Sequence, residues 1–312
     1  MLRLIADIGG TNARFALAEP GGPPQEERHL LVRDFPDPAA AIEAYLAGRR
    51  VEEAVIAVAT PVESDEIRFT NSPWAFSIMA LQARLGLSQL AVINDFVAQA
   101  LAMPHLAADE LELLGGGTPI PGRAIGVLGP GTGLGVSALV PGRHGWTALP
   151  TEGGHVSLAP GNARERDMLA ILSERFGHVS NERVLSGQGL LNLAQALATL
   201  SGRELAAATP EDVTAAARTG SCPVCCEAVA TFSALLGSAA GDLALMLGAR
   251  GGVFVAGGIC LRLGSLFDRA AFRRRFEAKG RMRVYLEPIP TWLVLRPDTG
   301  LLGAAHYRLE SE

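Results

Sequence analysis

Two glycine-rich segments with the same internal order, far apart in the chain, constrain the fold most strongly. Residues 4–17 (LIADIGGTNARFAL) and 125–139 (IGVLGPGTGLGVSAL) each run from an apolar strand through a glycine turn with one threonine into a second apolar strand. The order strand, glycine turn, strand is typical of a β-hairpin. Two such hairpins indicate two similar halves of the chain, each opened by its own glycine turn.

Apolar stretches of strand length alternate with segments of helical periodicity in both halves. The expected strands cover residues 2–7, 14–18, 30–34, 54–59, 90–93, 124–128, 136–140, 252–256, 282–286 and 292–295. The expected helices cover residues 38–46, 76–85, 96–103, 164–176, 190–200, 210–219, 222–248, 263–279 and 299–309. Strands that alternate with helices predict an α/β fold with a mostly parallel sheet covered on both faces.

Length and charge limit the classes of function. The chain has 312 residues, which is enough for about two domains. Its formal net charge of −5 does not favour a protein dedicated to nucleic acids. Asp7 interrupts the apolar N-terminal run, and the uncharged run 124–142 contains two prolines and six glycines, which would break a membrane helix. We therefore expect a cytoplasmic protein that binds neither nucleic acid nor membranes.

Lysine occurs once, at Lys279, so no glycine turn is followed by the lysine of a P-loop. Lys279 belongs to a basic run that matches no nucleic-acid-binding module. We expect this run to be a solvated helix face, and a role near a nucleotide phosphate stays open. Its members are Arg269, Arg273, Arg274, Arg275, Lys279, Arg281 and Arg283.

The four cysteines do not indicate a disulfide framework, which fits a reducing compartment. Cys222, Cys225 and Cys226 share one face of an expected helix, and Cys260 stands alone. The Cys222-x-x-Cys225 spacing occurs in zinc and redox sites, but no second pair completes a zinc set. We expect the cysteines to behave as small buried apolar residues.

Both glycine turns are candidate phosphate cradles. Glycine lets backbone N–H groups approach phosphate oxygens, and Thr11 and Thr132 each add a hydroxyl. Asp7, at the end of its strand, could hold Mg²⁺ through water. The alternative is a pair of plain tight hairpins. A strand rather than a helix follows residues 129–135, so this segment is not a dinucleotide-binding GxGxxG turn.

Asn94 and Asp95 follow an apolar strand and precede a helix. An ordinary helix N-cap is one interpretation. The other is functional, because open α/β sheets place their ligand groups at the carboxyl ends of parallel strands. An aspartate at that position could accept a hydroxyl proton during phosphoryl transfer.

Two further segments carry polar groups suited to a polyol. Glu152-Gly153-Gly154-His155 presents a carboxylate and an imidazole on a glycine loop, which suits hydrogen bonds to several hydroxyls. The glycines argue against a helical zinc site, and a plain surface loop is the alternative. Glu182 is ambiguous, because most isolated acidic residues of this kind are solvated.

Taken together, these segments resemble the bacterial glucokinases of the hexokinase–actin superfamily, in family order and over nearly the whole chain. The matching motifs are Asp7-x-Gly9-Gly10-Thr11-Asn12-x-Arg14, Asn94-Asp95-Phe96, residues 128–135 (LGPGTGLG), Glu152-Gly153-Gly154-His155, residues 182–187 (ERVLSG) and Ala256-Gly257-Gly258-Ile259. The cysteine-rich zinc motif of the other sugar-kinase group is absent. Gln188 departs from the family, which often has proline after Ser-Gly.

The resemblance implies ATP-dependent phosphorylation of glucose at O6, with Asp95 as the catalytic base. It implies that the sugar hydroxyls are bound by Asn94, Asp95, Glu152, His155 and Glu182, with Asn71 nearby. It implies that Asp7 holds Mg²⁺, through water, and that ATP is bound by Asp7, Gly9, Gly10, Thr11, Asn12, Gly131, Thr132, Gly257 and Gly258.

The resemblance also implies a two-domain, hexokinase/actin-like (ribonuclease H-like) fold with a cleft between the domains, and a homodimer. We expect a small domain of residues 1–104 and 297–312 and a large domain of residues 105–296 with inserted helices. The alternatives are a kinase for another hexose or small hydroxylated metabolite and, less expected, a non-catalytic sugar sensor. A sensor would need a DNA-binding module, and six residues precede Asp7.

Overall fold

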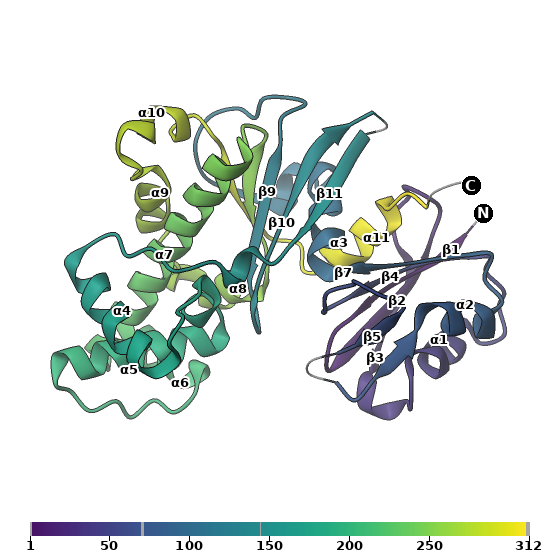
Figure 1. Ribbon diagram of the computed structural model, residues 1–312, viewed down its shortest axis with the longest axis horizontal. Helices are drawn as coiled ribbons and strands as arrows, with labels where there is room; N and C mark the ends of the chain where they lie inside the picture. Colours follow the sequence, from purple (N-terminus) through teal and green to yellow (C-terminus); the bar gives the residue numbers. More distant parts are fainter. Residues whose placement is uncertain (1, 70–71, 144, 310–312) are drawn as a thin grey trace. The chain divides into compact units, whose positions relative to one another are not determined.

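The computed structural model describes residues 2–69, 72–143 and 145–309, and these form two compact units (Figure 1). The first unit holds the chain up to Leu106, the short stretch Ala148–Pro150 and the chain from Asp298 onward. The second unit holds Ala107–Thr147 and Thr151–Pro297. Each unit contains one main sheet that includes a glycine-turn hairpin, as the sequence predicts. The expectation of a mostly parallel sheet is wrong, because both sheets mix parallel and antiparallel pairs.

The sheet of the first unit has the order β3-β2-β1-β4-β7. Its strands are β1 (Arg3–Ile8), β2 (Asn12–Ala18), β3 (Gln25–Leu31), β4 (Glu53–Val58) and β7 (Gln89–Asn94). β1 and β2 are antiparallel, and β1 also pairs in parallel with β4, which pairs in parallel with β7. The carboxyl ends of β1, β4 and β7 therefore lie at one edge of the sheet.

Helices cover both faces of this sheet (Figure 1). The helices of the first unit are α1 (Pro38–Leu46), α2 (Ile78–Leu85), α3 (Asp95–Ala102) and α11 (Thr299–His306), and a small ribbon is made of β5 (Glu66–Arg68) and β6 (Ala75–Ser77). Ile42 and Tyr45 of α1 are buried against alternate residues of β1, including Leu4 and Ile8. α3 and α11 pack closely on each other at the opposite face.

The sheet of the second unit has the order β11-β10-β9-β12-β13-β8. Its strands are β8 (Leu111–Gly115), β9 (Ile125–Pro130), β10 (Leu134–Gly142), β11 (Gly145–Thr151), β12 (Gly252–Val255) and β13 (Thr291–Val294). β9 and β10 form the second hairpin, and β12 pairs in parallel with both β9 and β13. Its helices are α4 (Ala163–Phe176), α5 (Gly187–Ser201), α6 (Pro210–Thr219), α7 (Pro223–Leu247), α8 (Gly258–Leu263), α9 (Arg269–Glu277) and α10 (Arg283–Leu286).

The long helix α7 forms the core of the second unit. By length and composition it could cross a membrane, with a mean hydropathy of 1.5 over its most apolar stretch, and 61% of that stretch is buried. α7 packs against α5, α6 and α9, and Phe232, Leu236 and Ala240 belong to the main apolar core. Packing within the unit accounts for the apolar character of this helix.

Three sequence predictions about secondary structure are wrong. The helix expected over residues 263–279 is broken, because Gly264 has a φ of +58° and Asp268 starts a new helix by accepting a bond from the Ala271 N–H at 2.8 Å. Residues 282–286 end in the helix α10 rather than forming a strand. The third strand covers Gln25–Leu31 rather than the expected 30–34. Its first five residues are exposed and polar, so only its last two, Leu30 and Leu31, carry an apolar signal.

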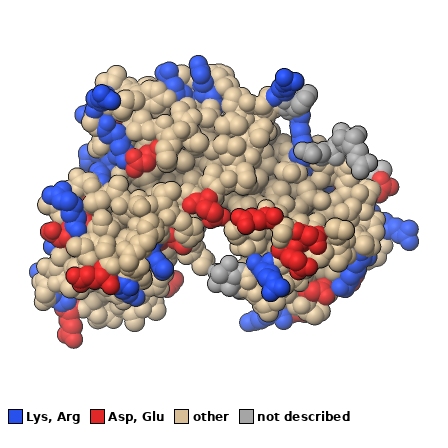
Figure 2. Space-filling view, viewed as in Figure 1, with Lys and Arg blue, Asp and Glu red and all other residues tan. Residues whose placement is uncertain are grey.

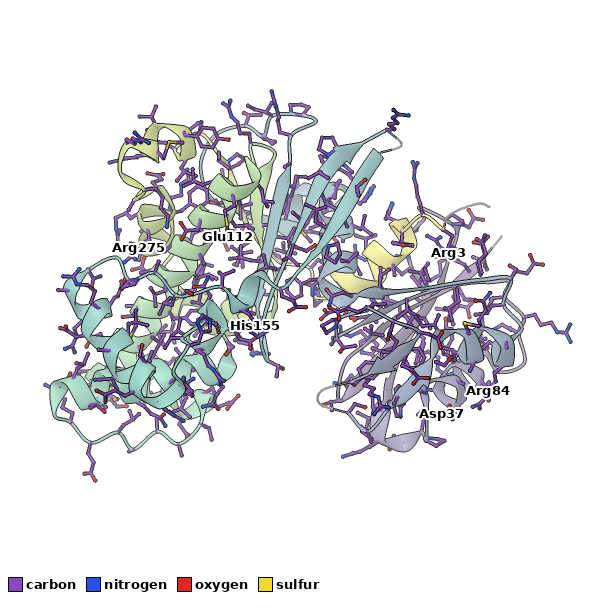
Figure 3. The ribbon with its side chains drawn as sticks, in the orientation of Figure 1. Arg3, Asp37, Arg84, Glu112, His155 and Arg275 are labelled. Carbon is purple, nitrogen blue, oxygen red and sulfur yellow. The ribbon has the colours of Figure 1, made fainter. Side chains whose placement is uncertain are left out.

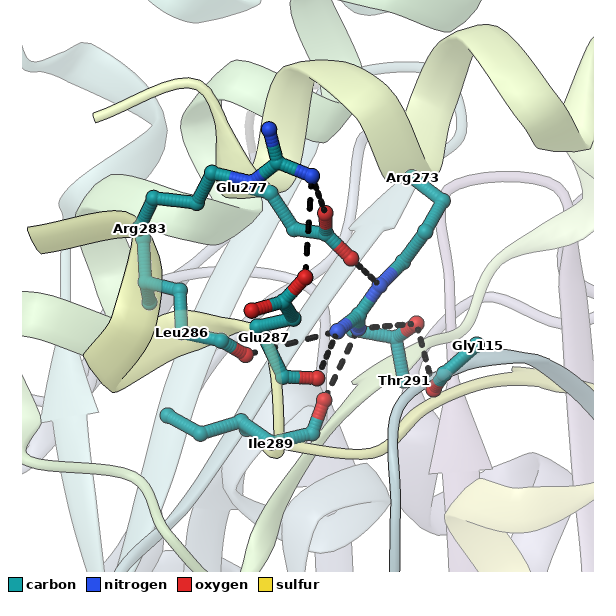
Figure 4. A network of polar contacts seen from close by, with 8 residues as sticks. All are labelled: Gly115, Arg273, Glu277, Arg283, Leu286, Glu287, Ile289 and Thr291. Carbon is teal, nitrogen blue, oxygen red and sulfur yellow. Dashed lines mark hydrogen bonds and ion pairs between the residues drawn. The ribbon is translucent and has the colours of Figure 1, made fainter. Parts of the chain in front are cut away.

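The basic run is largely paired rather than solvated, which corrects another prediction. Arg273 is 9% exposed, and its guanidinium donates to the carbonyls of Ile289 at 2.8 Å and Glu287 at 2.7 Å and to Glu277 Oε1 at 2.7 Å (Figure 4). Lys279 Nζ lies 2.8 Å from Asp242 Oδ1. These contacts fix α9 and α10 to the rest of the unit, and Arg274, Arg281 and Arg283 remain exposed.

Close packing of α3 on α11 generates the first prediction. A Cβ at Gly303 would overlap the carbonyl oxygen of Ala98, so Gly303→Ala must push the two helices apart. We expect a loss of about 1–3 kcal/mol in the free energy of unfolding, measured with urea. The control is Gly187→Ala, where the nearest atom would lie 3.7 Å away and the change should be much smaller. A Gly303→Ala protein as stable as the parent would contradict this packing.

Candidate active site

The first group of candidate residues gathers at the carboxyl edge of the sheet in the first unit. The register aligns Ile8 with Val58 and Val58 with Asn94, so β1, β4 and β7 end in one row. Asp7 precedes this row on β1, and Asp95 follows it at the start of α3. The two carboxylates therefore share one edge of the sheet, where open α/β folds bind their ligands.

Asp7 is held from two directions. Arg14 of the paired strand β2 places Nη1 3.2 Å from Asp7 Oδ2, and its Nε lies 3.4 Å from Oδ1 of Asp298. The start of α11 also packs closely against Asp7, because a Cβ at Gly300 would lie 2.9 Å from the Asp7 carboxyl carbon. Burial raises the pKa of Asp7, and Arg14 opposes that rise. Asp7 is thus a well-fixed carboxylate with limited access to water.

The turn after Asp7 is tight and lies at the surface. The Gly9 N–H donates to the Asn12 carbonyl at 2.9 Å, which leaves Gly10 and Thr11 at the tip. Thr11 and Asn12 are exposed, and the Thr11 carbonyl accepts a bond from the Val32 N–H at 3.0 Å. The turn therefore presents backbone and hydroxyl groups beside the Asp7 carboxylate.

The sequence left open whether Asn94 and Asp95 form a helix N-cap or a functional site, and the structure gives the two residues different roles. Asn94 is the N-cap of α3, because its Oδ1 accepts from the N–H groups of Phe96 at 2.9 Å and Val97 at 3.4 Å. Its Nδ2 donates to the Thr60 carbonyl at 3.3 Å, which joins the ends of β4 and β7. Since Asn94 supplies the cap, Asp95 is not needed for it.

Asp95 has the electrostatics of a proton acceptor at neutral pH. Burial raises its pKa to about 7, and the negative charge of Asp7 adds to the rise. The Phe96 N–H, 2.9 Å from Oδ1, opposes it and orients the carboxylate. A carboxylate tuned to neutral pH at a ligand-binding edge is a candidate general base.

The second group lies at the carboxyl ends of β9 and β12 in the second unit. The loop of the β9–β10 hairpin is closed by a bond from the Gly131 N–H to the Gly133 carbonyl at 2.8 Å. Gly257 follows β12 with a φ of +80°, and a Cβ there would press on the Pro130 carbonyl. Only glycine fits this approach, which brings Gly257 and Gly258 against the hairpin that carries Gly131 and Thr132.

Two loops meet the backbone of Leu134 in the second unit. Its N–H donates to Glu182 Oε2 at 2.9 Å, and a Cβ at Gly133 would overlap that oxygen. A Cβ at Gly154 would overlap the Leu134 carbonyl oxygen. The short helices Gly153–His155 (η4) and Asn181–Arg183 (η5) are therefore held on one segment of β10.

This arrangement brings Glu152, His155 and Glu182 into one region of the second unit. Glu152 and His155 are exposed, with 62% and 58% of their side chains accessible, and His155 Nε2 lies 3.8 Å from Glu152 Oε2 (Figure 3). The His155 carbonyl is 3.1 Å from His178 Nε2. A carboxylate and an imidazole on a fixed backbone can both bind hydroxyl groups of a ligand.

The remaining predictions concern Asn71 and the metal. Asn71 lies outside the described residues. Within the described part of the chain, no group of three or more His, Cys, Asp and Glu side chains could hold a metal ion by itself.

The sequence analysis did not identify two residues that contact the Asp7 site. These are Asp298, just before α11, and Gly300, in the first turn of α11. Asp298 and Gly300 lie far from Asp7 in the sequence, and the resemblance of residues 297–304 to the family's C-terminal region gives neither of them a role. The sequence analysis also missed a cavity of about 350 Å³ in the second unit. Its lining includes Leu134, Val156 and Met246, so it is mainly apolar and adjoins the Leu134 segment.

Known proteins resemble this chain over its whole length. A sequence model of the family described as Glucokinase matches residues 4–311. The glucokinase of Paramagnetospirillum magneticum is 52% identical over 307 residues, which are 97% of this chain and 96% of that protein.

Solved structures share the fold of this chain. A crystal structure of a glucokinase from an Antarctic psychrotroph is 36% identical, with a TM-score of 0.90 and coverage of 98% of each chain. A ROK-family glucokinase from Streptomyces griseus, in complex with glucose and AMPPNP, is 21% identical with a TM-score of 0.63 over 98% of each chain. The predicted hexokinase/actin-like fold class is confirmed.

The capping role of Asn94 generates a prediction about stability. Asn94→Ala removes the acceptor for the first N–H groups of α3 and should reduce the free energy of unfolding by about 1 kcal/mol. Asn94→Ser keeps a capping oxygen and should recover most of that loss. Thermal or urea unfolding of the three proteins checks this, and equal stability of the alanine and serine variants would show that the cap is dispensable.

Proposed function

The chain belongs to the glucokinase family and phosphorylates glucose with ATP. We propose that Asp95 is the general base of this reaction. The carboxylate would accept the proton of the attacking glucose hydroxyl as the phosphoryl group is transferred. The observation that carries this proposal is the position of Asp95 where the parallel strands β1, β4 and β7 end, and burial there raises its pKa to about 7. A base with a pKa near the working pH is the most effective.

The proposed acceptor is O6 of glucose, the one primary hydroxyl of that sugar. We assign the recognition of the sugar hydroxyls to Asn94, Glu152, His155 and Glu182 together with Asp95. The amide of Asn94 and the exposed heads of Glu152 and His155 support this assignment, because they combine donors and acceptors. Glu182 commits Oε2 to the Leu134 N–H, so Oε1 is its proposed sugar ligand. Asn71 stays a prediction from the sequence.

ATP is the proposed partner of both glycine turns. On the first unit we assign phosphate contacts to Gly9, Gly10, Thr11 and Asn12, beside Asp7. On the second unit we assign them to Gly131 and Thr132, with Gly257 and Gly258 beside the nucleoside. The exposed Thr11 hydroxyl and the close approach of Gly257 to the hairpin support these roles.

Magnesium is the proposed metal, with Asp7 as its protein ligand through water. The donor fits, because the carboxylate is a hard oxygen ligand already oriented by Arg14 at 3.2 Å. When bound, Mg²⁺ would neutralise charge on the transferring phosphates. Arg14 and the start of α11 would keep the carboxylate of Asp7 in one orientation while the nucleotide binds.

We further propose a cytoplasmic enzyme that binds neither nucleic acid nor membrane and forms a homodimer. Figure 2 supports the absence of nucleic-acid binding, because acidic as well as basic side chains lie on the face that it shows. The burial of most of α7 supports the absence of membrane binding. The proposed domains are residues 1–104 with 297–312, and residues 105–296.

Substitution of the base is the direct test of its role. Asp95→Asn keeps the shape but cannot accept a proton, so kcat should fall by about 10²–10⁴ with a smaller change in the KM for glucose. Stability should not fall, because the variant removes a partly buried charge. Coupled ADP detection gives the rates, and thermal unfolding gives the control. An unchanged kcat would remove Asp95 from this role.

The raised pKa of Asp95 predicts the pH dependence. Below about pH 7 the carboxyl is increasingly protonated in the free enzyme and cannot act as a base. The value of kcat/KM for glucose should therefore fall about tenfold for each pH unit on the acidic side. A profile that stays flat down to pH values near the ordinary pKa of aspartate would contradict the assignment. The residual activity of Asp95→Asn should lack this inflection.

A further inference from the structure

The start of α7 holds a pair of thiols that the reaction does not use. Cys222 is the N-cap of this helix, and its Sγ accepts a bond from the Cys225 N–H at 3.3 Å. An N-cap and the third helical residue lie one turn apart on the same side, at a separation that a disulfide can bridge.

The two thiols differ in access to solvent. Cys222 is half-buried between the exposed residues Ser221 and Pro223, whereas Cys225 is fully buried. The bond with the Cys225 side chain lowers the pKa of Cys222, with smaller contributions from backbone N–H groups and the charge of Arg203. Burial raises the pKa of Cys225 to about 12. Cys222 thus has the features of an attacking thiol, and Cys225 those of a resolving thiol.

The other two cysteines are placed differently. Cys226 Sγ points to the Ala217 carbonyl of α6, at 3.7 Å. Cys260 is fully buried on α8, and burial raises its pKa to about 12. Neither shares the hydrogen bond that joins Cys222 to Cys225, so the geometry selects one pair among the four.

We propose that Cys222 and Cys225 form a reversible dithiol–disulfide site that reacts with small disulfides of the glutathione class. The Cys222 thiolate attacks one sulfur of the small disulfide, forms a mixed disulfide and releases the first thiolate. The Cys225 proton passes to the released thiolate, and the Cys225 sulfur then attacks Cys222 and releases the second. The proton that Cys222 loses on forming its thiolate goes to the second released thiolate. In total the protein loses two protons and two electrons, and the small disulfide becomes two thiols.

Arg203 gives the site a preference among disulfides. It follows the end of α5, is exposed, and its charge acts on the Cys222 sulfur. A positive charge beside the attacking sulfur favours an anionic reactant such as oxidised glutathione over the cationic disulfide cystamine.

The first experiment treats the full-length protein with oxidised glutathione, blocks the remaining thiols and maps disulfides by mass spectrometry after proteolysis. We expect a Cys222–Cys225 bond that dithiothreitol reverses. Cys222→Ser should abolish it, and the matched control Cys226→Ser should retain it. Unchanged glucose phosphorylation by both variants would show that they fold. A bond that uses Cys226, or no intramolecular bond in the folded parent protein, would overturn the proposal.

A second experiment compares the rates of oxidation by oxidised glutathione and by cystamine. Arg203→Gln should slow the reaction with oxidised glutathione by roughly threefold to tenfold and leave cystamine unaffected or faster. Equal slowing with both reagents would contradict the charge preference.

Discussion

The first unit depends on the partial burial of two carboxylates, Asp7 and Asp95, where the parallel strands β1, β4 and β7 end. Asp95 is partly removed from water and lies in the field of Asp7, and together these raise its pKa to about 7. Between pH 3.8, the ordinary pKa of aspartate, and about pH 7, the folded protein therefore keeps a proton on Asp95 that the unfolded chain has already released. Across that interval, rising pH reduces stability, so the group suited to catalysis weakens the fold at neutral pH.

The neighbouring basic side chain, Arg14, pairs with Asp7, and no ion pair to Asp95 is seen among the described residues. Arg14 bridges Asp7 and Asp298, and α11 approaches closely enough to require glycine at position 300. The second unit uses the same device, since glycine at 133, 154 and 257 lets loops come into contact with the hairpin backbone. The glycine-rich motifs are thus packing requirements as well as candidate phosphate cradles.

The sequence predicts the parts of the fold that depend on local signals. Both hairpins are correct, and the helices at 38–46 and 210–219 have the predicted limits, because proline and a capping residue mark their starts. The break at Gly264 is a local signal that the sequence analysis overlooked, because a glycine with a positive φ and the capping residue Asp268 end one helix and start the next. The pairing of Arg273 with the carbonyls of Glu287 and Ile289 was missed because it depends on tertiary contacts. Asp298 escaped notice for the same reason. The sequence allows either Asn94 or Asp95 to cap α3. Only the structure shows that Asn94 is the cap, which leaves Asp95 as the candidate base.

The central claim is that the fold tunes Asp95 to neutral pH before any ligand binds. Carbon-13 NMR of the aspartate carboxyl groups in the ligand-free protein measures this directly, with the Asp95 signal identified by its absence in Asp95→Asn. We expect a titration midpoint of about 7. A midpoint close to the ordinary value of 3.8 would contradict the claim.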